Sequence, residues 1–486
     1  MNKDLKLKDV WYWGSNFAML GMASISMYLD NPIPMLLVAI PLIMLDRAYF
    51  VPVLLFIACI EGSFSSEDSS SQAESWAIMA MTPIFIFDFF HHNKVKVPLK
   101  FTVFFILFFF FIILGAFVYA MHPYIGQALI PIFGKRAVGL SALYVKIIMK
   151  SLKIVFFFFY LKTLINKDKG LVYRSLQIIK DLTPYLMGCI LVDMLLFGAR
   201  STQFDTLHFG EAKHGDFTAN LDALGIYLYV GIFEVKTSWF KRMVNLGALA
   251  FLLYMIMELA SRNGLLCFIL IAGFGGLMAI WNRNLAFKTI TIVAAVAVLG
   301  VALYLFKDSP TIERLVYYQE ERGGGDRLAY WLGGAMALGE EPLFGLGGDE
   351  ASSAYAVGKY GTDVTDHVMH NTFLEFAVEY GLIGVAFYIC FVSLILYHAY
   401  KNFMFAMKYN DMLIAVPSVA YFISIFAGLF VSRIWESTLW YNTLLVFAVY
   451  ILFRMPVEKA ARNRKAYLIH GLPDPMLNPA LAIQPG

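Results

Sequence analysis

Long apolar runs recur along the whole chain and are separated by polar connections. A helix needs about 20 apolar residues to cross the hydrocarbon core of a bilayer, and most of these runs approach that length. The pattern predicts up to fourteen spans, at residues 11–29, 33–46, 47–62, 74–91, 99–120, 138–162, 179–198, 219–235, 243–259, 264–281, 288–306, 371–398, 412–432 and 437–454. The second and third of these runs are short for a crossing, so we expect tilted or re-entrant segments there and about 12–14 transmembrane helices in all.

The composition agrees with an all-α polytopic integral membrane protein. Hydrophobic residues make up 59% of the 486 residues and charged residues 15%, which is too little charge to cover the surface of a soluble multidomain protein. The net charge of +3 gives no basic field for nucleic acid. The four cysteines lie inside apolar runs without metal spacing, and the Phe-rich stretch Phe104–Phe111 is predicted to face lipid and nothing else.

The basic residues predict the orientation. Both termini and the connections on their side hold 24 of the 38 Lys and Arg residues, the other side holds 11, and three lie within spans. Because basic residues are retained on the cytoplasmic side, we expect both termini to be cytoplasmic. The only long hydrophilic segment is then exoplasmic. We expect a transmembrane bundle at 1–306, this large loop at 307–370, further transmembrane helices at 371–454 and a cytoplasmic tail at 455–486.

Two arginines on the exoplasmic side are candidate ligands for a phosphate group. Arg262 lies in a short connection, against the positive-inside bias, and Arg327 lies in the large loop. A guanidinium stays charged and presents paired donors that fit a phosphate. The alternatives are ion pairs with Glu258 and Asp326 or, for Arg262, an extension of the side chain to the lipid headgroups.

His370 closes the large loop and is a candidate general base, because an imidazole near its ordinary pKa accepts a proton at neutral pH. Capping of the following helix is the alternative role. Asp363, Asp366 and His367 fall at helical spacing with His370, which leaves a metal site open as a further alternative. The loop glycines are not followed by Gly-Lys-Ser/Thr, so we expect no nucleotide site and instead expect tight turns.

Lys146, Lys150 and Lys153 share one helical face of the predicted span 138–162. Three ammonium groups are costly in lipid, so either this face lines a wet cavity that suits an anionic headgroup, or residues 138–150 form an interfacial helix. Acids in other spans that are candidate partners for these lysines are Asp193, Asp222 and Glu234.

The order of the motifs resembles the O-antigen ligase and polymerase superfamily of bacterial envelope glycosyltransferases. The resemblance covers about residues 255–390. The matching parts are Ser261-Arg262, Arg327 with Trp331, Pro342-Leu343-Phe344-Gly345-Leu346-Gly347, and His370-Asn371-x-x-Leu374-Glu375 followed by Gly381-Leu382-Ile383-Gly384. Each motif is weak alone, and their order around one large exoplasmic loop carries the resemblance. Asn263 departs from the family pattern, where a small residue is more usual.

The resemblance implies a metal-independent glycosyltransferase without a cofactor, in the bacterial inner membrane and active on the periplasmic face. Such enzymes transfer an undecaprenyl diphosphate-linked glycan to lipid A-core in the case of ligases. In polymerases of O-antigen or exopolysaccharide, the acceptor is another lipid-linked repeat unit. By resemblance, Arg262 and Arg327 would bind the diphosphate and His370 would be the general base. Candidate supporting residues are Arg200, Lys146, Lys150, Lys153, Asn371 and Glu375. The high span count favours a polymerase slightly.

A transporter of an anionic solute is the alternative of a different class, with the lysine face of span 138–162 as its pathway. Transporters usually have paired repeats with interrupted helices in corresponding positions, and the sequence has no evident repeat of that kind. The 64-residue loop is also more than transport requires. We therefore favour the glycosyltransferase over the transporter.

Overall fold

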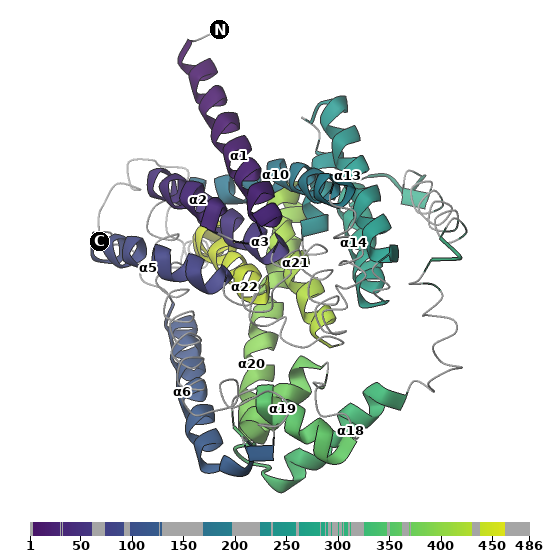
Figure 1. Cartoon of the computed structure of the whole chain (residues 1–486). Coiled ribbons are helices and arrows are strands. Elements are labelled where there is room, and N and C mark those ends of the chain that lie inside the picture. The colour runs from purple at the N-terminus through teal and green to yellow at the C-terminus, as the bar shows by residue number, and fades with distance from the viewer. Residues whose placement is uncertain are drawn as a thin grey trace, which may run out of the picture.

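The computed structural model is a bundle of helices with a smaller helical unit at one end (Figure 1). The structure describes residues 3–29, 31, 33–60, 73–91, 98–125, 127–128, 169–196, 224–234, 237–258, 262–281, 283–286, 288–289, 293, 300, 304, 306–309, 312, 325–347, 350–361, 369, 371–429 and 438–461. Every regular element among these residues is helical.

The elements follow one another along the chain with mostly short connections between described neighbours. They are α1 (Lys3–Leu29), α2 (Ile33–Leu45), the 3-10 helix η1 (Arg47–Tyr49), α3 (Phe50–Ile60), α5 (Ala73–His91), α6 (Leu99–Met121), α10 (Lys169–Leu196), α13 (Trp239–Glu258), α14 (Arg262–Ile280), α18 (Gly325–Glu340), α19 (Glu350–Ala356), the π-helix η3 (Val357–Gly361), α20 (Thr372–Lys408), α21 (Met412–Gly428), α22 (Thr438–Val449) and the π-helix η5 (Tyr450–Arg454). An unlabelled helix covers Leu224–Phe233.

Five of the described helices are long and apolar enough to cross a membrane, and they lie in α6, α10, α13, α14 and α20. Five shorter apolar helices of 10–17 residues accompany them. The prediction of an all-α polytopic membrane protein is therefore confirmed. The predicted spans 33–46 and 47–62, which were short for a membrane crossing, correspond to α2 with 13 residues and α3 with 11. The predicted span 138–162 lies outside the described residues.

The centre of the bundle is α21, which packs against α10, α14, α20 and α22. Its residues are almost all buried, with Tyr421 completely enclosed, which is expected of a helix surrounded by other helices. A second group, made of α1, η1, α3 and α13, packs around α10, and α2 packs on α1. Because α10 also contacts α21, both groups share one hydrophobic core.

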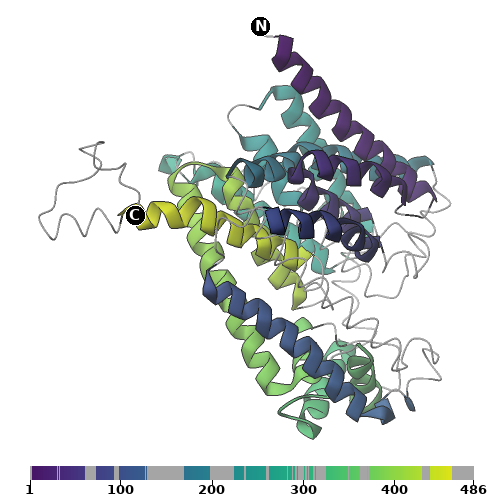
Figure 2. The same cartoon turned by 90° about the vertical axis from the view of Figure 1, so that its left-hand side faces the viewer.

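The Phe-rich stretch of α6 is partly buried, so the prediction that it faces only lipid is wrong. Figures 1 and 2 show α6 running beside α20. Phe108 lies 4.7 Å from Phe391 between ring centroids, and Phe111 stacks on Phe387 at 4.9 Å. Exposed residues such as Phe110 and Phe117 occupy the opposite face of α6. The stretch therefore packs one face on α20 and leaves the other to the membrane.

α20 is longer than predicted and is broken near its start. It continues to Lys408 instead of ending near residue 398, because Ala399, Phe403 and Ala406 continue its buried face. Gly381 has φ 68° and ψ −171°, which no helix contains, so α20 consists of two helical halves.

Candidate active site

Part of the predicted exoplasmic loop forms a compact unit with its own hydrophobic core. Figure 1 shows α18 and α19 beside the ends of α6 and α20. Buried residues of this second core come from α18 and its flanks (Tyr330, Leu346), from α6 (Tyr119) and from α20 (Val378), and Met369 is completely buried among them. Described residues of three sequence motifs, Trp331, Leu346 and Leu374, are therefore packed together in this core.

Residues 342–347 replace the helical hydrogen bonds that are lost at the break in α20. In an unbroken helix, the carbonyls of Val378 and Glu379 would accept from the amides four residues later. Here Leu346 N donates to Val378 O at 2.7 Å, and Gly347 N donates to Glu379 O at 3.0 Å. The carbonyls at the end of the first half of α20 are thus satisfied by the loop.

The same segment also satisfies the amides that begin the second half of α20. Leu382 N donates to Pro342 O at 2.8 Å, and Ile383 N donates to Leu343 O at 3.4 Å. The loop motif and the helix motif are therefore one structural unit, although they are about 40 residues apart in the sequence. Backbone polar groups buried at such a break need partners, which accounts for the close fit.

Glycine is required where the two segments meet. Gly345 and Gly381 have φ values of 72° and 68°, in the region that L side chains disfavour. A Cβ atom at Gly381 would also collide with the carbonyl of Leu343, and one at Gly345 would collide with the carbonyl of Val378. The prediction that the loop glycines provide tight turns is confirmed at Gly345, whose amide closes a turn on Glu341 O at 2.9 Å, whereas Gly381 lies at the break in α20.

α18, which contains Arg327, packs against α20. The indole Nε1 of Trp331 donates to the carbonyl of Met369 at 3.0 Å. A side chain at Gly334 would collide with Met369 and Leu374, so the helix approaches this segment closely. Arg327 is half-buried and lies one helical turn before Trp331, on the same side of α18. Of the predicted pair, Trp331 thus contacts Met369, the residue that precedes His370 in the sequence.

Arg262 belongs to a different helix, which contacts the end of α21 close to the start of α20. It is the first residue of α14, not part of a connection as predicted, and it is half-buried. The next residue, Asn263, donates to Ala427 O of α21 at 3.5 Å. A Cβ atom at Gly428 would lie 3.2 Å from Thr372 Oγ1. The starts of α14 and α20 therefore meet at the end of α21.

Asn371 and Glu375 form the first turn of α20. Asn371 is the N-cap, and its side-chain oxygen accepts from Leu374 N at 3.0 Å. Glu375 is buried, with 5% of its surface exposed. The positive ends of the α14 and α20 dipoles face this region, which favours an anion there. His370, Arg200, the three lysines of span 138–162 and the alternative metal ligands Asp363, Asp366 and His367 lie outside the described residues.

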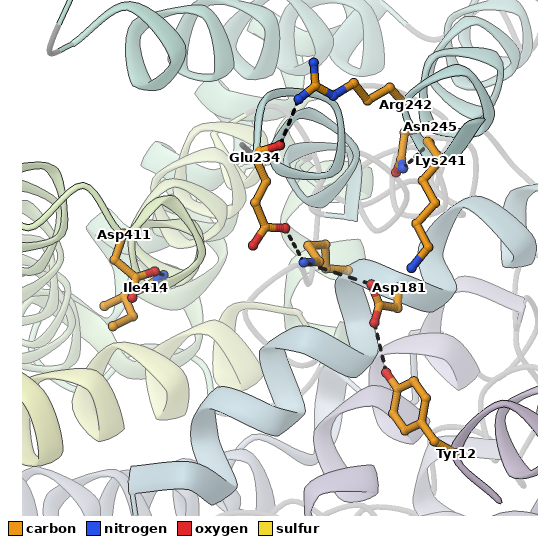
Figure 3. A network of polar contacts seen from close by, with 9 residues as sticks. Tyr12, Asp181, Glu234, Lys241, Arg242, Asn245, Asp411 and Ile414 are labelled. Carbon is orange, nitrogen blue, oxygen red and sulfur yellow. Dashed lines mark hydrogen bonds and ion pairs between the residues drawn. The ribbon is translucent and has the colours of Figure 1, made fainter. Parts of the chain in front are cut away.

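A second polar cluster, which the sequence did not indicate as a unit, lies at the other end of α20 (Figure 3). Lys180 Nζ donates to Glu234 at 2.5 Å and lies 4.0 Å from Asp181, whose other oxygen accepts from Tyr12 at 3.1 Å. Glu234, named above as a possible partner for the lysine face of 138–162, is thus paired with Lys180. Two cavities of about 380 Å³ and 1440 Å³ adjoin Asp181.

The sequence signal for this cluster was an adjacent Lys180-Asp181 pair inside a predicted span. Such charges inside a membrane protein are retained when they have partners, and here these partners come from α1 and from the end of the Leu224–Phe233 helix. The cluster joins helices that are distant in sequence. It contains none of the motifs that carry the resemblance.

The fold is that of a polytopic helical membrane protein. Among the described residues, the starts of α14 and α20 and the turn of α18 around Trp331 lie in one region, the candidate composite site. Residues 247–389 match the family model described as O-antigen ligase. This match contains Arg262, Arg327 and Gly381, and it confirms the resemblance found in the sequence. It supports a membrane glycosyltransferase of the O-antigen ligase or polymerase type. No curated protein matches the chain.

Proposed function

We propose that the protein transfers a glycan from undecaprenyl diphosphate to an acceptor hydroxyl, with a polymerase favoured over a ligase. The observation that supports this most is that the helices containing Arg262 and Arg327 both reach the start of α20. α18 does so through the Trp331 bond to Met369, and α14 does so through the end of α21, which adjoins Thr372. The family match supplies the general class of reaction. The periplasmic face is proposed from the distribution of basic residues, which puts this end of the molecule outside the cytoplasm.

The proposed chemistry is a single displacement at the anomeric carbon of the donor sugar. The acceptor hydroxyl attacks this carbon while the bond to the diphosphate oxygen breaks. His370 takes the hydroxyl proton, and undecaprenyl diphosphate leaves with the bonding electrons. Arg262 and Arg327 offset the negative charge that develops on the leaving group, so the residues themselves meet the electrostatic need without a cofactor.

Asn371 has a positioning role in this proposal. As the N-cap it fixes the start of α20 immediately after His370, while the Trp331 bond holds the carbonyl of Met369 immediately before it. Glu375 lies one turn further along α20 and is a candidate partner for the imidazole or the acceptor. Lys146, Lys150, Lys153 and Arg200 stay predictions as contacts for the anionic lipid carrier.

The test uses purified protein in nanodiscs, a lipid-linked repeat unit as donor, and separate measurements of donor binding and of glycan transfer. Arg262→Lys and Arg327→Lys keep the charge but lose the planar pair of donors, so we expect transfer to fall at least about 100-fold. His370→Ala should abolish transfer while donor binding persists, because a base acts on the acceptor.

The matched control is Arg174→Lys, at the opposite end of the molecule. Arg174 is half exposed and pairs with Asp46, so its replacement should leave transfer near the parental rate. Transfer at near-parental rates by folded Arg262→Lys and His370→Ala would refute the proposed site. Separate reactions with a lipid-linked repeat and with lipid A-core as acceptor distinguish the polymerase from the ligase.

A further inference from the structure

Three tyrosines come together on the surface of the unit formed by α18, α19 and the end of α6. Tyr124 follows α6, and its ring lies 5.7 Å from the ring of Tyr355 in an edge-to-face arrangement. Lys359 Nζ lies 5.3 Å from the ring of Tyr355 and 4.8 Å from that of Tyr360. We call Tyr124, Tyr355 and Tyr360 the tyrosine platform. Tyr124 is 41% exposed and the other two are partly exposed.

Charged side chains border the tyrosine platform and are held in place. Lys359 donates to Glu340 at 2.7 Å, and this bond raises the pKa of Lys359 to about 12. His122 donates through Nδ1 to Val118 O at 2.9 Å, and its Nε2 lies 3.7 Å from Glu341. The two carboxylates and the ammonium remain 32–50% exposed, so each can still bind a ligand.

An aromatic belt at the membrane surface is the ordinary role for such tyrosines. The charges at the border do not suit that role, because two glutamates oppose a single lysine and repel anionic headgroups. A sugar fits them better. The C–H face of a pyranose packs on an aromatic ring, and its hydroxyls both donate to carboxylates and accept from an ammonium. The excess of carboxylates selects against acidic sugars.

The tyrosine platform is remote from the proposed reaction centre but joined to it by α18. Arg327 lies near one end of this helix and Glu340 at the other, 13 residues apart, which is about 20 Å along the axis. Both ends pack on the same hydrophobic core as Met369. A glycan of several sugars bound near Arg327 by its diphosphate can extend along α18 to the platform.

We propose that the tyrosine platform binds a neutral or amino sugar of the glycan substrate, several sugars away from the bond that is transferred. This proposal rests on the proposed function for the identity of the ligand. The platform acts as a binding subsite that holds the glycan chain, and it takes no part in the transfer chemistry itself.

The test measures binding of oligosaccharides to the full-length protein in nanodiscs. The probes are oligosaccharides released by mild acid from the surface polysaccharide of the source strain and labelled with a fluorophore at the reducing end. Tyr124→Ala and Tyr355→Ala should each weaken binding about tenfold, which is the effect of losing one aromatic contact. Tyr355→Phe keeps the ring and should bind like the parent. The control Tyr400→Ala, on the exposed face of α20, should also bind like the parent.

Failure of the parent to bind these probes, or unchanged binding by Tyr124→Ala and Tyr355→Ala, would overturn the proposal. Tyr124 is exposed, so Tyr124→Ala is expected to fold and still tests the proposal if Tyr355→Ala does not fold. Arg262→Lys should lose transfer without losing oligosaccharide binding. Oligosaccharide binding without glycan transfer in the parent protein would therefore contradict the proposed function alone. Glycan transfer without oligosaccharide binding would contradict the role of the tyrosine platform alone.

Discussion

At the scale of single residues, the proposed site depends on how Met369 and Asn371, the two sequence neighbours of His370, are held. Trp331 is the residue that connects α18 to this backbone, through its bond to the carbonyl of Met369. Packing alone would leave α18 free to shift along α20, whereas a directional hydrogen bond fixes its position. The position of α18, the helix that contains Arg327, relative to Met369 is therefore fixed by an indole N–H.

Trp331→Phe is expected to keep the fold and impair transfer. Phenylalanine retains most of the buried ring but lacks the donor, so stability should fall by about 1 kcal/mol. Transfer should fall more than donor binding, because the proposed general base His370 and the proposed diphosphate ligand Arg327 lose their relative position. Thermal melting and transfer rates measure the two effects. Trp239→Phe is the control, since Trp239 is 75% exposed, and it should change neither quantity.

The sequence predicted Arg262, Arg327 and His370 as candidate site residues because charged and titratable side chains are rare in a chain this apolar. Arg262 stood out against the positive-inside bias, and the structure adds that it begins α14. The neighbourhood of these residues was not predictable, because it depends on contacts such as that between Gly428 and Thr372, more than 50 residues apart. Local periodicity contains no information about such contacts.

At the scale of elements, the broken helix and the loop that repairs it form the frame of the site. The sequence around Gly381 continues an apolar helical pattern, so the break was not predicted. The break is possible because residues 342–347 form the hydrogen bonds that the backbone of α20 loses there. The burial of the Phe-rich face of α6 was missed for a related reason. Lipid is as apolar as a neighbouring helix, so hydropathy does not distinguish the two surroundings.

Gly381→Ala is expected to destabilise the protein strongly. An L side chain at a positive φ costs about 1–2 kcal/mol, and its Cβ atom would in addition collide with the carbonyl of Leu343. The matched control is Gly276→Ala in α14, where a Cβ atom meets nothing within 4 Å and alanine favours the helix. Thermal unfolding in detergent compares the two variants. Equal melting temperatures would contradict the proposed role of the break.

At the scale of the whole molecule, α20 separates two polar regions by the thickness of a membrane. Its second half, residues 382–408, spans about 40 Å, which exceeds the hydrocarbon core of about 30 Å. The composite site lies at the start of α20, and the cluster of Lys180, Asp181 and Glu234 lies beyond its end. In the proposed function, the end at the start of α20 binds the substrate on one side of the bilayer. At the other end, ion pairs of Lys180 with Asp181 and Glu234 connect helices to one another.

This arrangement makes the orientation testable without any enzymatic assay. A reporter that is active only in the periplasm should be active when fused near residue 320 and silent when fused near residues 170 or 465. The expected pattern follows from the 24 basic residues on the side of the termini against 11 on the other. A reporter that is active only in the cytoplasm should give the complementary result. The reverse pattern for both reporters would put the composite site in the cytoplasm, where a periplasmic glycan transfer is impossible, and the proposed function would fall with it.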